Sequence, residues 1–527
     1  MSYHSVVYAA SGLVLLVAFI RYLSAPKKTN LPPGPKGLPF LGNVKDLPPA
    51  GVPEYSHWLK HKDLYGPISS ISMLGQTLVV LHDKKVAAEI LEKKSSKSSD
   101  RPTTEMNHLL NQQAMIVPNL PLNDNIRYCR KLFHQQMGTG KLVERFQSTL
   151  DLESRRFMLN ILKTPDDILK HMHTLAGATI LKATYGYSPE TNGNDPLVNR
   201  IENFIALLMD TVTPGRWMVD LFPMIKHWPK GLPGTEYARA VRGVANEWKD
   251  LERIPYNFVR SQMDFGSHAP SFVSNALEER LVEKKSKLTP ADEEAALKST
   301  AAIMYIAAEE TTTTSLRAII LAMLRYPEVQ RKAHEEIDRV IGHDRLPGYE
   351  DQKSLPYIEA LITEVMRWWP AVPMGVPHMV AEDMTAGGYL IPKGAAILPS
   401  VWWFCHDPET HPDPERFDPE RFLAPRNEAD PREIIFGYGR RICPGRHFAD
   451  TTLWINVARL LAAFEMSKAV DANGNEIDPN PSGSAGLSLR IESFPFKITA
   501  RNKQRAELVE RVCATEDVAG QSHMLNL

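Results

Sequence analysis

The feature that most constrains this 527-residue chain is one cysteine near its C-terminal end, Cys443. It lies in the string Phe436–Gly445, which reads FGYGRRICPG, and an apolar run with helical character follows it. Pro444 suits the first turn of a helix, where its missing N–H costs least. Cys443 is therefore predicted at a helix N-terminus, where unpaired N–H groups and the helix dipole stabilise a thiolate. A thiolate beside arginines and glycines suits the proximal ligand of a haem iron; the alternative is a buried structural cysteine in a glycine-rich turn.

The whole string resembles the haem-binding signature of the cytochrome P450 family, F-x-x-G-x-R-x-C-x-G. Every fixed position of that signature is filled in this chain, by Phe436, Gly439, Arg441, Cys443 and Gly445. The resemblance implies that Cys443 is the axial ligand of the haem iron and that Arg441 holds a haem propionate. It also implies that Phe436 packs near the sulfur and that Gly439 belongs to the cofactor-binding loop.

The composition is that of a globular protein with an ample core, because 43% of the residues are hydrophobic. The net charge of −1 gives no electrostatic case for nucleic acid. The four cysteines fit neither a zinc motif nor a compact disulfide framework, so free thiols are the simplest interpretation. Helical patterns dominate to about Tyr326, and loops and short strands follow Pro370. This order predicts a mainly α fold with minor β sheets.

The N-terminus carries an apolar run, Val6–Ile20, with no charge before Arg21. Its length is short for a spanning helix and overlaps that of a signal-peptide core. Basic residues follow the run and no good cleavage site comes after it, which favours an uncleaved anchor over a cleaved signal. Residues 1–25 are therefore predicted as a single transmembrane anchor that leaves the body of the protein in the cytosol. Residues 26–50, rich in proline, are predicted as a stiff hinge, and residues 51–527 as the catalytic domain.

Short elements are also predicted from the local pattern. The predicted elements are a helix over Pro53–Lys60, a hairpin of Ile68–Met73 and Thr77–Leu81, a helix over Lys84–Lys93, and a long helix over about Ala291–Leu324.

Two acids and the four threonines Thr311–Thr314 interrupt the apolar pattern of that long helix. Threonine is a poor helix former and a buried acid is costly, and such local inconsistency often marks function. A threonine hydroxyl that bonds back to a helix carbonyl can open a kink. The stretch resembles the family's oxygen-binding motif, [AG]-G-x-[DE]-T-T, although Ala308 stands where the family has glycine. The resemblance implies that Glu310 and Thr311 are a catalytic pair that delivers protons; the alternative is a solvated acidic turn.

Glu364 and Arg367 share one helix face at spacing i,i+3. Alone this pair is weak evidence, because most such pairs are surface salt bridges worth under ~1 kcal/mol. Its position before Cys443 resembles the family's helix pair, which an arginine from a downstream P-E-R-F segment completes. Two segments offer that arginine, and the distance to the cysteine favours Arg421 over Arg416. The implied role of the three residues is a buried structural network that fixes the haem-side loop.

Arg130 and the substrate walls are assigned by family position. Arg130 matches an arginine that contacts a haem propionate, whereas Ile126 stands where the family often has a tryptophan; the alternative for Arg130 is a solvated surface arginine. The predicted walls are Met106–Ile116, Phe204–Met218, Ile303–Ala307, Val372–Gly375 and Gly486–Leu489. These walls are largely apolar, with Glu310 as the only nearby acid and no basic cluster, so a hydrophobic substrate is expected.

The resemblance covers the chain from the hinge to Arg490 and looks most like fungal microsomal members that serve secondary metabolism. It implies the cytochrome P450 fold, haem with a thiolate ligand, and a location in the endoplasmic reticulum membrane. It implies an O₂-dependent monooxygenase that receives electrons from NADPH through NADPH-cytochrome P450 reductase and hydroxylates a terpenoid, aromatic or polyketide-derived molecule. One alternative is a haem-thiolate isomerase, dehydratase or peroxygenase without a reductase, against which the intact acid–threonine pair argues. The other is a non-catalytic haem-binding sensor.

Overall fold

The computed structural model describes residues 30–39, 41–49, 51–73, 75–102, 104–190, 195–212, 216–280, 288–514 and 520–525. The predicted anchor, residues 1–25, lies outside these ranges. Among the described helices, none combines the length and the apolar character needed to cross a bilayer. The chain divides into two units: the first is Met1–Pro102 with Met374–Phe404, and the second is Thr103–Pro373 with Cys405–Leu527.

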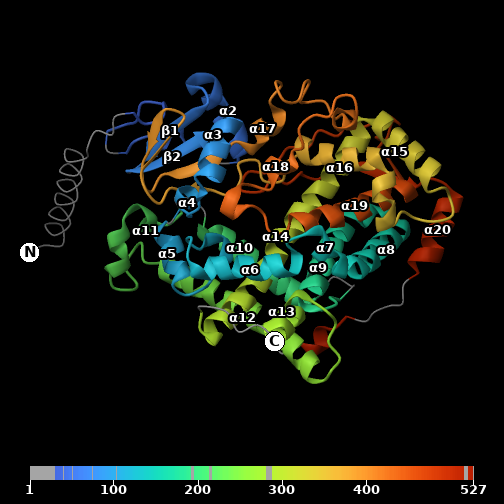
Figure 1. The fold of residues 1–527 in the computed structure, drawn as a ribbon, viewed down its shortest axis with the longest axis horizontal. Helices are drawn as coiled ribbons and strands as arrows, with labels where there is room; N and C mark the ends of the chain where they lie inside the picture. Colours follow the sequence, from blue (N-terminus) through green and yellow to red (C-terminus); the bar gives the residue numbers. More distant parts are fainter. Residues whose placement is uncertain are drawn as a thin grey trace, which may run out of the picture. The chain divides into compact units, whose positions relative to one another are not determined.

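The first unit is built on a four-stranded sheet with the strand order β1-β2-β6-β3; β1 and β2 are labelled in Figure 1. The strands are β1 (Ile68–Met73), β2 (Gln76–Leu81), β3 (His378–Met379) and β6 (Ala396–Pro399). β1 and β2 pair antiparallel with Ile68 opposite Leu81, which confirms the predicted hairpin. β6 lies parallel to β2 and antiparallel to β3. A separate two-stranded sheet pairs β4 (Met384–Ala386) with β5 (Tyr389–Ile391).

Short helices complete the first unit. They are η1 (Val44–Asp46), α2 (Glu54–Tyr65), α3 (Lys84–Ala88), the π-helical turn η2 (Glu89–Lys93), α4 (Ser95–Ser98) and the start of α17 (Val401–His406). The helix predicted over Lys84–Lys93 therefore changes from α to π hydrogen bonding halfway. The Asp83 side chain accepts from the Val86 N–H and fixes where α3 begins.

The described part of the proline-rich segment is bonded to the sheet of the first unit. The Ser70 N–H donates to the Pro33 carbonyl oxygen at 2.8 Å, and the Ser70 hydroxyl donates to the Pro32 carbonyl oxygen at 2.6 Å. Proline lacks a donor but keeps its carbonyl acceptor, so it can lie along a sheet edge without joining the ladder. The described part of the segment thus belongs to the first unit.

The second unit holds most of the helices. Its elements are α5 (Glu105–Asn111), η3 (Val117–Asn119), α6 (Asp124–Met137), α7 (Gly140–Val143), η4 (Glu144–Phe146), α8 (Gln147–Lys163), η5 (Pro165–Asp167), α9 (Ile168–Tyr185), α10 (Pro196–Val212), α11 (Met218–Leu221), η6 (Pro223–His227), α12 (Tyr237–Asp264), α13 (Phe272–Arg280), α14 (Pro290–Arg325), α15 (Pro327–Val340), η7 (Tyr349–Ser354), α16 (Pro356–Trp368), η8 (Pro419–Phe422), α18 (Arg432–Ile435), η9 (Gly439–Arg441), α19 (Arg446–Ala463), β7 (Phe464–Lys468), β8 (Phe496–Ala500), α20 (Lys503–Cys513) and η10 (Ser522–Met524).

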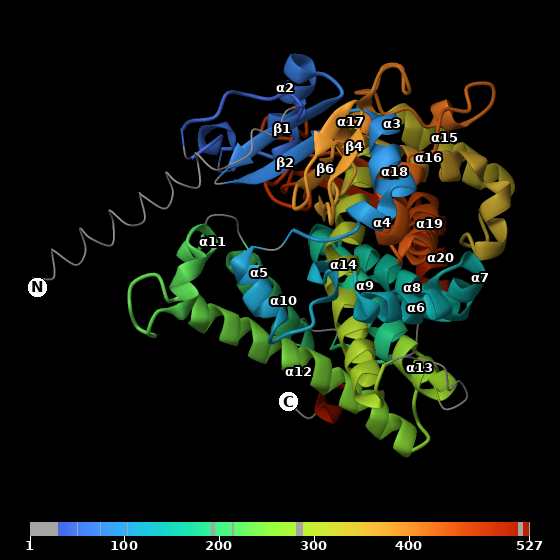
Figure 2. The ribbon, with the colours of Figure 1, turned by 60° about the vertical axis from the view of Figure 1, so that its left-hand side comes forward.

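The 36-residue helix α14 organises the second unit and confirms the long helix predicted from the sequence. The Thr289 side chain accepts a hydrogen bond from the Asp292 N–H, and Pro290 occupies the first turn. Both features fix where α14 begins. The helix packs against α6, α9, α12, α16 and α19 (Figure 2).

Two hydrophobic cores meet along α14. Met304 and Tyr305 belong to a first core that also contains buried residues of α5, α6, α10 and α12. Leu316 and the run Ala318–Leu324 belong to a second core. This core also contains buried residues of α8, α15, α16 and α19. The acids and threonines of the predicted oxygen-binding motif lie between these two contributions.

Candidate active site

Cys443 lies on a tight loop in front of α19. The Cys443 N–H donates to the Phe436 carbonyl oxygen at 2.6 Å and closes the loop. Gly437 and Gly439 have φ angles of 78° and 51°, in the left-handed region that residues with a Cβ rarely adopt. Phe436 is half-buried and packs against the second core. The glycines of the motif thus shape the backbone that presents the thiol.

The start of α19 differs from the prediction. The helix begins at Arg446 and Gly445 is its N-cap, so Pro444 lies outside the helix rather than in its first turn. The prediction placed the helix too early because proline is equally acceptable in the turn that precedes an N-cap. Cys443 therefore lies two residues before the cap and not on the helix itself.

The surroundings of the Cys443 thiol act on its pKa in opposite directions. Burial raises the pKa, whereas the Gly445 N–H and the positive charges of Arg130 and Arg446 lower it and only partly offset the burial. The helix N-terminus alone is therefore not enough to produce the predicted thiolate. Coordination to a metal ion deprotonates a thiol outright, and Cys443 is free to coordinate because it forms no disulfide.

Two arginines border the cysteine loop. Arg130 on α6 donates from Nη2 to the Ile442 carbonyl oxygen at 2.8 Å, and Arg441 donates from Nη2 to the Leu120 carbonyl oxygen at 2.7 Å. Burial lowers the pKa of Arg130 and the neighbouring Cys443 raises it. A thiol for iron beside two guanidiniums for carboxylates is the donor set that haem and its two propionates require. These residues therefore fit haem.

The threonine run of α14 shows the back-bonding that the sequence suggested. Thr311 donates from Oγ1 to the Ala307 carbonyl oxygen at 2.9 Å, and Thr313 makes the same bond to the Glu309 carbonyl oxygen at 2.9 Å. The helix continues unbroken through these bonds, so no kink large enough to end it accompanies them. Ala307 is exposed and Thr311 is half-buried, although most of α14 is buried. Thr311 therefore lies on an accessible stretch in the middle of the helix.

The two acids before the threonines belong to one cluster of charges. Glu310 Oε1 lies 3.1 Å from Nε of Arg490, and Glu309 Oε1 lies 2.5 Å from Nδ1 of His173 on α9. Nε2 of His173 lies 3.1 Å from Nη2 of Arg317. Arginine can only donate, so this Nε2 accepts and Nδ1 carries the hydrogen that goes to Glu309.

This cluster surrounds the two acids with basic groups that the sequence did not place there. Arg490 pairs with Glu310, and Arg317 reaches Glu309 through His173. Burial and the charge of Arg490 lower the pKa of Arg317, and Glu309 and Glu310 raise it. The only local signal was the spacing i,i+7 between Glu310 and Arg317. Arg490 and His173 come from distant parts of the chain and leave no local pattern.

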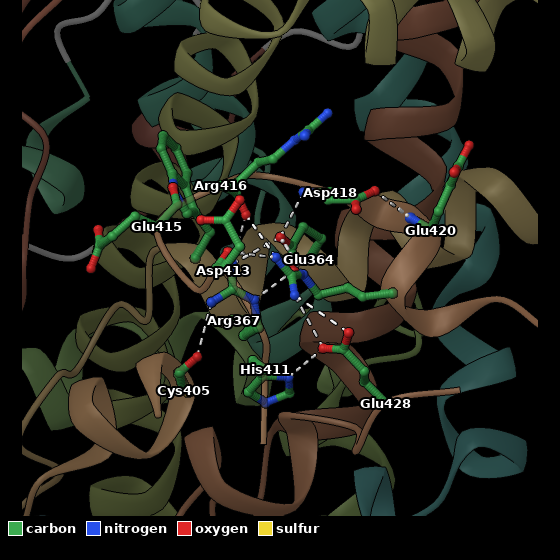
Figure 3. Close-up of polar contacts among 12 residues, drawn as sticks. Glu364, Arg367, Cys405, His411, Asp413, Glu415, Arg416, Asp418, Glu420 and Glu428 are labelled. Atoms are coloured by element: carbon green, nitrogen blue, oxygen red, sulfur yellow. Dashed lines mark hydrogen bonds and ion pairs between the residues drawn. The ribbon is translucent and has the colours of Figure 1, made fainter. Parts of the chain in front are cut away.

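The structure brings Glu364, Arg367 and Arg421 together in one buried cluster (Figure 3). Arg367 donates to both carboxylate oxygens of Glu364, from Nε at 2.6 Å and from Nη2 at 2.8 Å. Arg421 donates from Nε to Glu364 Oε1 at 3.1 Å, and the Asp418 N–H donates to the same oxygen at 2.8 Å. The three side chains are at most 1% exposed. Removal from water raises the pKa of Glu364, and both guanidiniums oppose this.

The outer nitrogens of the two arginines hold the surrounding backbone. Arg421 donates to the carbonyl oxygens of Pro412, Asp413 and Arg416, and Arg367 donates to those of Cys405 and Arg416. Arg421 also contacts Glu428, which pairs with His411. Arg416, the other candidate in the sequence, contributes only its carbonyl to these bonds, and its own side chain is exposed. The cluster thus ties α16 to residues 405–428.

The fold and the site define a class: a mainly helical protein with small sheets, in which a loop before a helix presents a cysteine whose surroundings fit haem. The chain belongs to the cytochrome P450 family, whose model, described as Cytochrome P450, matches residues 32–497. Family members bind haem through this thiolate and ordinarily receive electrons from NADPH through a reductase. The enzyme class is accordingly that of the cytochrome P450 monooxygenases.

Several fungal proteins are similar to this chain along nearly all of its length. The chain is 43% identical over 522 residues to a multifunctional cytochrome P450 monooxygenase of Aspergillus fumigatus, covering 97% of this chain and 96% of the relative. It is 44% identical over 503 residues to a cytochrome P450 monooxygenase of Gibberella zeae, covering 95% of each. It is 34% identical over 514 residues to O-methylsterigmatocystin oxidoreductase of Aspergillus flavus, covering 97% and 95%.

Proposed function

We propose that this monooxygenase uses NADPH, through NADPH-cytochrome P450 reductase, to hydroxylate a small to medium hydrophobic molecule of terpenoid, aromatic or polyketide-derived structure. The proposed setting is secondary metabolism or the oxidation of foreign compounds. The observation that carries the proposal is the accessible Thr311, next to Glu310 on the central helix, in a unit that also holds the thiol and its two guanidiniums. The fungal monooxygenases to which the chain is similar support it.

Each site residue has a proposed role. Bound haem supplies the activation of O₂, and Cys443 is its ligand, with Arg130 and Arg441 binding the propionates. The Thr311 hydroxyl holds a proton and passes it on. To do so, it gives up its hydrogen bond to the Ala307 carbonyl oxygen. Glu310 brings protons to that hydroxyl from the solvent side.

Glu364, Arg367 and Arg421 have a proposed structural role. Their hydrogen bonds to carbonyl oxygens between Cys405 and Arg416 fix the segment that leads into the cysteine loop. A buried carboxylate with two guanidiniums and a backbone N–H keeps one backbone arrangement, because any other leaves charges unpaired.

The proposed location is the membrane of the endoplasmic reticulum, with the catalytic domain facing the cytosol. Besides the predicted anchor, a surface around α11 and η6 supports membrane contact. Large apolar side chains are exposed there at Met218, Leu221, Phe222, Met224, Trp228 and Leu232. Met224 is 73% exposed, and Lys226 and Lys230 lie in the same stretch. Exposed apolar side chains with adjacent basic residues suit the interface of an anionic bilayer.

The test is a reconstituted assay with full-length enzyme, reductase and NADPH. A panel of terpenoids, polycyclic aromatics, fatty acids and polar acids is scored by substrate-induced spectral shift and by NADPH-dependent product. Turnover of the hydrophobic classes supports the proposal. Turnover only of polar acids, or equal turnover without reductase, contradicts it.

Thr311→Ala tests the proton role within the same assay. We expect substrate binding to be retained and the NADPH consumed per product to rise severalfold, because the alcohol that guides protons is lost. Thr313→Ala is the matched control, since Thr313 makes the same back-bond but is buried. Equal ratios for the two variants would remove Thr311 from the mechanism.

A further inference from the structure

The carboxylate of Glu310 is met by an arginine from the C-terminal loop of the second unit. Arg490 Nε lies 3.1 Å from Glu310 Oε1, with the Arg490 side chain 64% exposed and the Glu310 side chain 37% exposed. Among the residues that the structure describes, neither side chain has a second ion pair. The contact joins a residue of the proposed proton path to a loop 180 positions away in the sequence.

The backbone on which Arg490 lies is fixed by bonds of its own. The Ser484 N–H donates to the Arg490 carbonyl oxygen at 2.9 Å, and the Arg490 N–H donates to Ser484 Oγ at 3.0 Å. An isolated bridge between Gly483 and Ile491 closes the same loop. The Cα of Arg490 is therefore held in place independently of its side chain.

Other side chains attach this loop to the helices. Arg317 donates from Nη1 to the Ile491 carbonyl oxygen at 2.9 Å, and Trp369 donates from Nε1 to the Leu489 carbonyl oxygen at 2.8 Å. Arg325 donates from Nη2 to the Pro479 carbonyl oxygen at 2.9 Å. Because these bonds hold the backbone, the Arg490 guanidinium is not needed to dock the loop.

The exposure of the Glu310–Arg490 pair argues against a role in stability. A pair this open to water gains little from its Coulomb attraction and costs side-chain entropy. What it does provide is a fixed place for a carboxylate that otherwise has three free torsions on the surface of a helix. No hydrogen bond joins Glu310 to Thr311 in the described structure, so the carboxylate has to move before it reaches the threonine hydroxyl.

We propose that Arg490 is a positioning residue that holds the Glu310 carboxylate and sets when it moves to the Thr311 hydroxyl. The inference rests on the proposed proton-transfer role of Glu310. Arg490 directly follows Gly486–Leu489, a predicted wall of the substrate site. The arginine thus links the position of that wall to the position of the acid.

The experiment is a double-mutant cycle in the reconstituted full-length enzyme, with Glu310→Gln, Arg490→Gln and both together. We expect Arg490→Gln to raise the NADPH consumed per product by roughly two- to fivefold, the range available to an exposed ion pair, and to alter the pH dependence of that ratio. Arg490→Lys retains the charge and should restore the ratio. In the Glu310→Gln background, Arg490→Gln should change nothing further.

Two readouts separate positioning from a structural role. The thermal unfolding midpoint and the substrate dissociation constant from spectral titration should not change in Arg490→Gln. Arg325→Gln is the control for loop attachment, because Arg325 binds the Pro479 carbonyl oxygen and contacts no acid in this cluster. It should leave the NADPH ratio unchanged.

The outcomes distinguish the two proposals. A Glu310→Gln enzyme with a normal ratio refutes the role of Glu310 and this inference with it. An altered Glu310→Gln enzyme beside a normal Arg490→Gln enzyme refutes this inference alone. So does an effect of Arg490→Gln that persists in the Glu310→Gln background, or one that Arg325→Gln reproduces, because Arg490 would then act through the loop.

Discussion

The second unit contains two glutamate–arginine sites that use the same chemistry in opposite surroundings. Glu364 is fully buried with Arg367 and Arg421. The carboxylate and the two guanidiniums bond to charged side chains or to backbone groups. Glu310 and Arg490 are both substantially exposed and share one contact. On the proposed roles, burial and hydrogen-bond saturation, rather than the residue pair, separate a carboxylate that serves as scaffold from one that can move.

The sharpest way to break this comparison is to remove the buried carboxylate. Glu364→Ala leaves two buried guanidiniums without their acid, so we expect a loss of about 3–5 kcal/mol in the free energy of unfolding. Urea unfolding with haem retention as a second signal measures it. Glu310→Gln is the contrasting control, and its loss should stay below ~1 kcal/mol because the pair is exposed. Similar losses for both variants would refute the distinction.

A substitution that keeps the charge tests whether geometry matters in the buried cluster. Arg421→Lys retains one positive charge but cannot donate at once to Glu364 and to the carbonyl oxygens of Pro412 and Asp413. We expect a loss of roughly 2 kcal/mol, because buried acceptors lose their donors. Arg416→Lys is the matched control at the neighbouring P-E-R-F segment and should be near neutral. Equal effects would mean that Arg421 acts only as a charge.

The smallest expected effect is on stability at low pH, and it tests the carboxyl of Glu428 at the edge of the buried cluster. Burial alone raises the pKa of Glu428, but hydrogen bonds from His411 and Arg426 and the charge of Arg421 bring it below its ordinary value of 4.5. A carboxyl whose folded-state pKa is lowered stabilises the fold fully above that ordinary value. This contribution is lost as the pH falls through the folded-state pKa.

Glu428→Gln should therefore flatten the acid limb of stability. As the pH falls below the ordinary value of 4.5, the unfolding free energy of the wild type should fall more steeply than that of the variant. Glu335→Gln removes an exposed partner of Arg331 and is the control, which should follow the wild type. Parallel curves for wild type and Glu428→Gln would contradict the assignment of this acid dependence to Glu428.

Local sequence patterns predicted the parts of the fold and site that depend on neighbours in the chain. The β1–β2 hairpin and the long helix over about Ala291–Leu324 were predicted from the local pattern, and the structure contains both. The choice of Arg421 over Arg416 rested on distance to Cys443 along the chain, and the structure places Arg421 beside Glu364. These features leave their signal within a few residues or in a fixed spacing.

The remaining features arise from contacts that only the folded chain creates. Arg490 and His173 reach α14 from the C-terminal loop and from α9, and neither carries a local signature. The π-helical turn Glu89–Lys93 has the same helical pattern as an α-helix, so periodicity does not separate them. The predicted start of α19 was wrong: the N-cap is Gly445, two residues after Cys443.

The meeting of two cores along α14 has a consequence for how this enzyme can diversify. The first core includes Met106, Leu110, Phe204 and Leu208, which lie in predicted substrate walls. The second core surrounds α16 and α19, which carry the buried glutamate network and follow the cysteine loop. If those walls line the substrate site as predicted, changes in side-chain volume in the first core would alter what the enzyme accepts. The same core also contains Phe448 of α19 and Phe133, whose ring a Cβ at Gly445 would touch. Changes at that end of the core would therefore reach the cysteine loop as well, so substrate range and haem-side packing share one set of side chains.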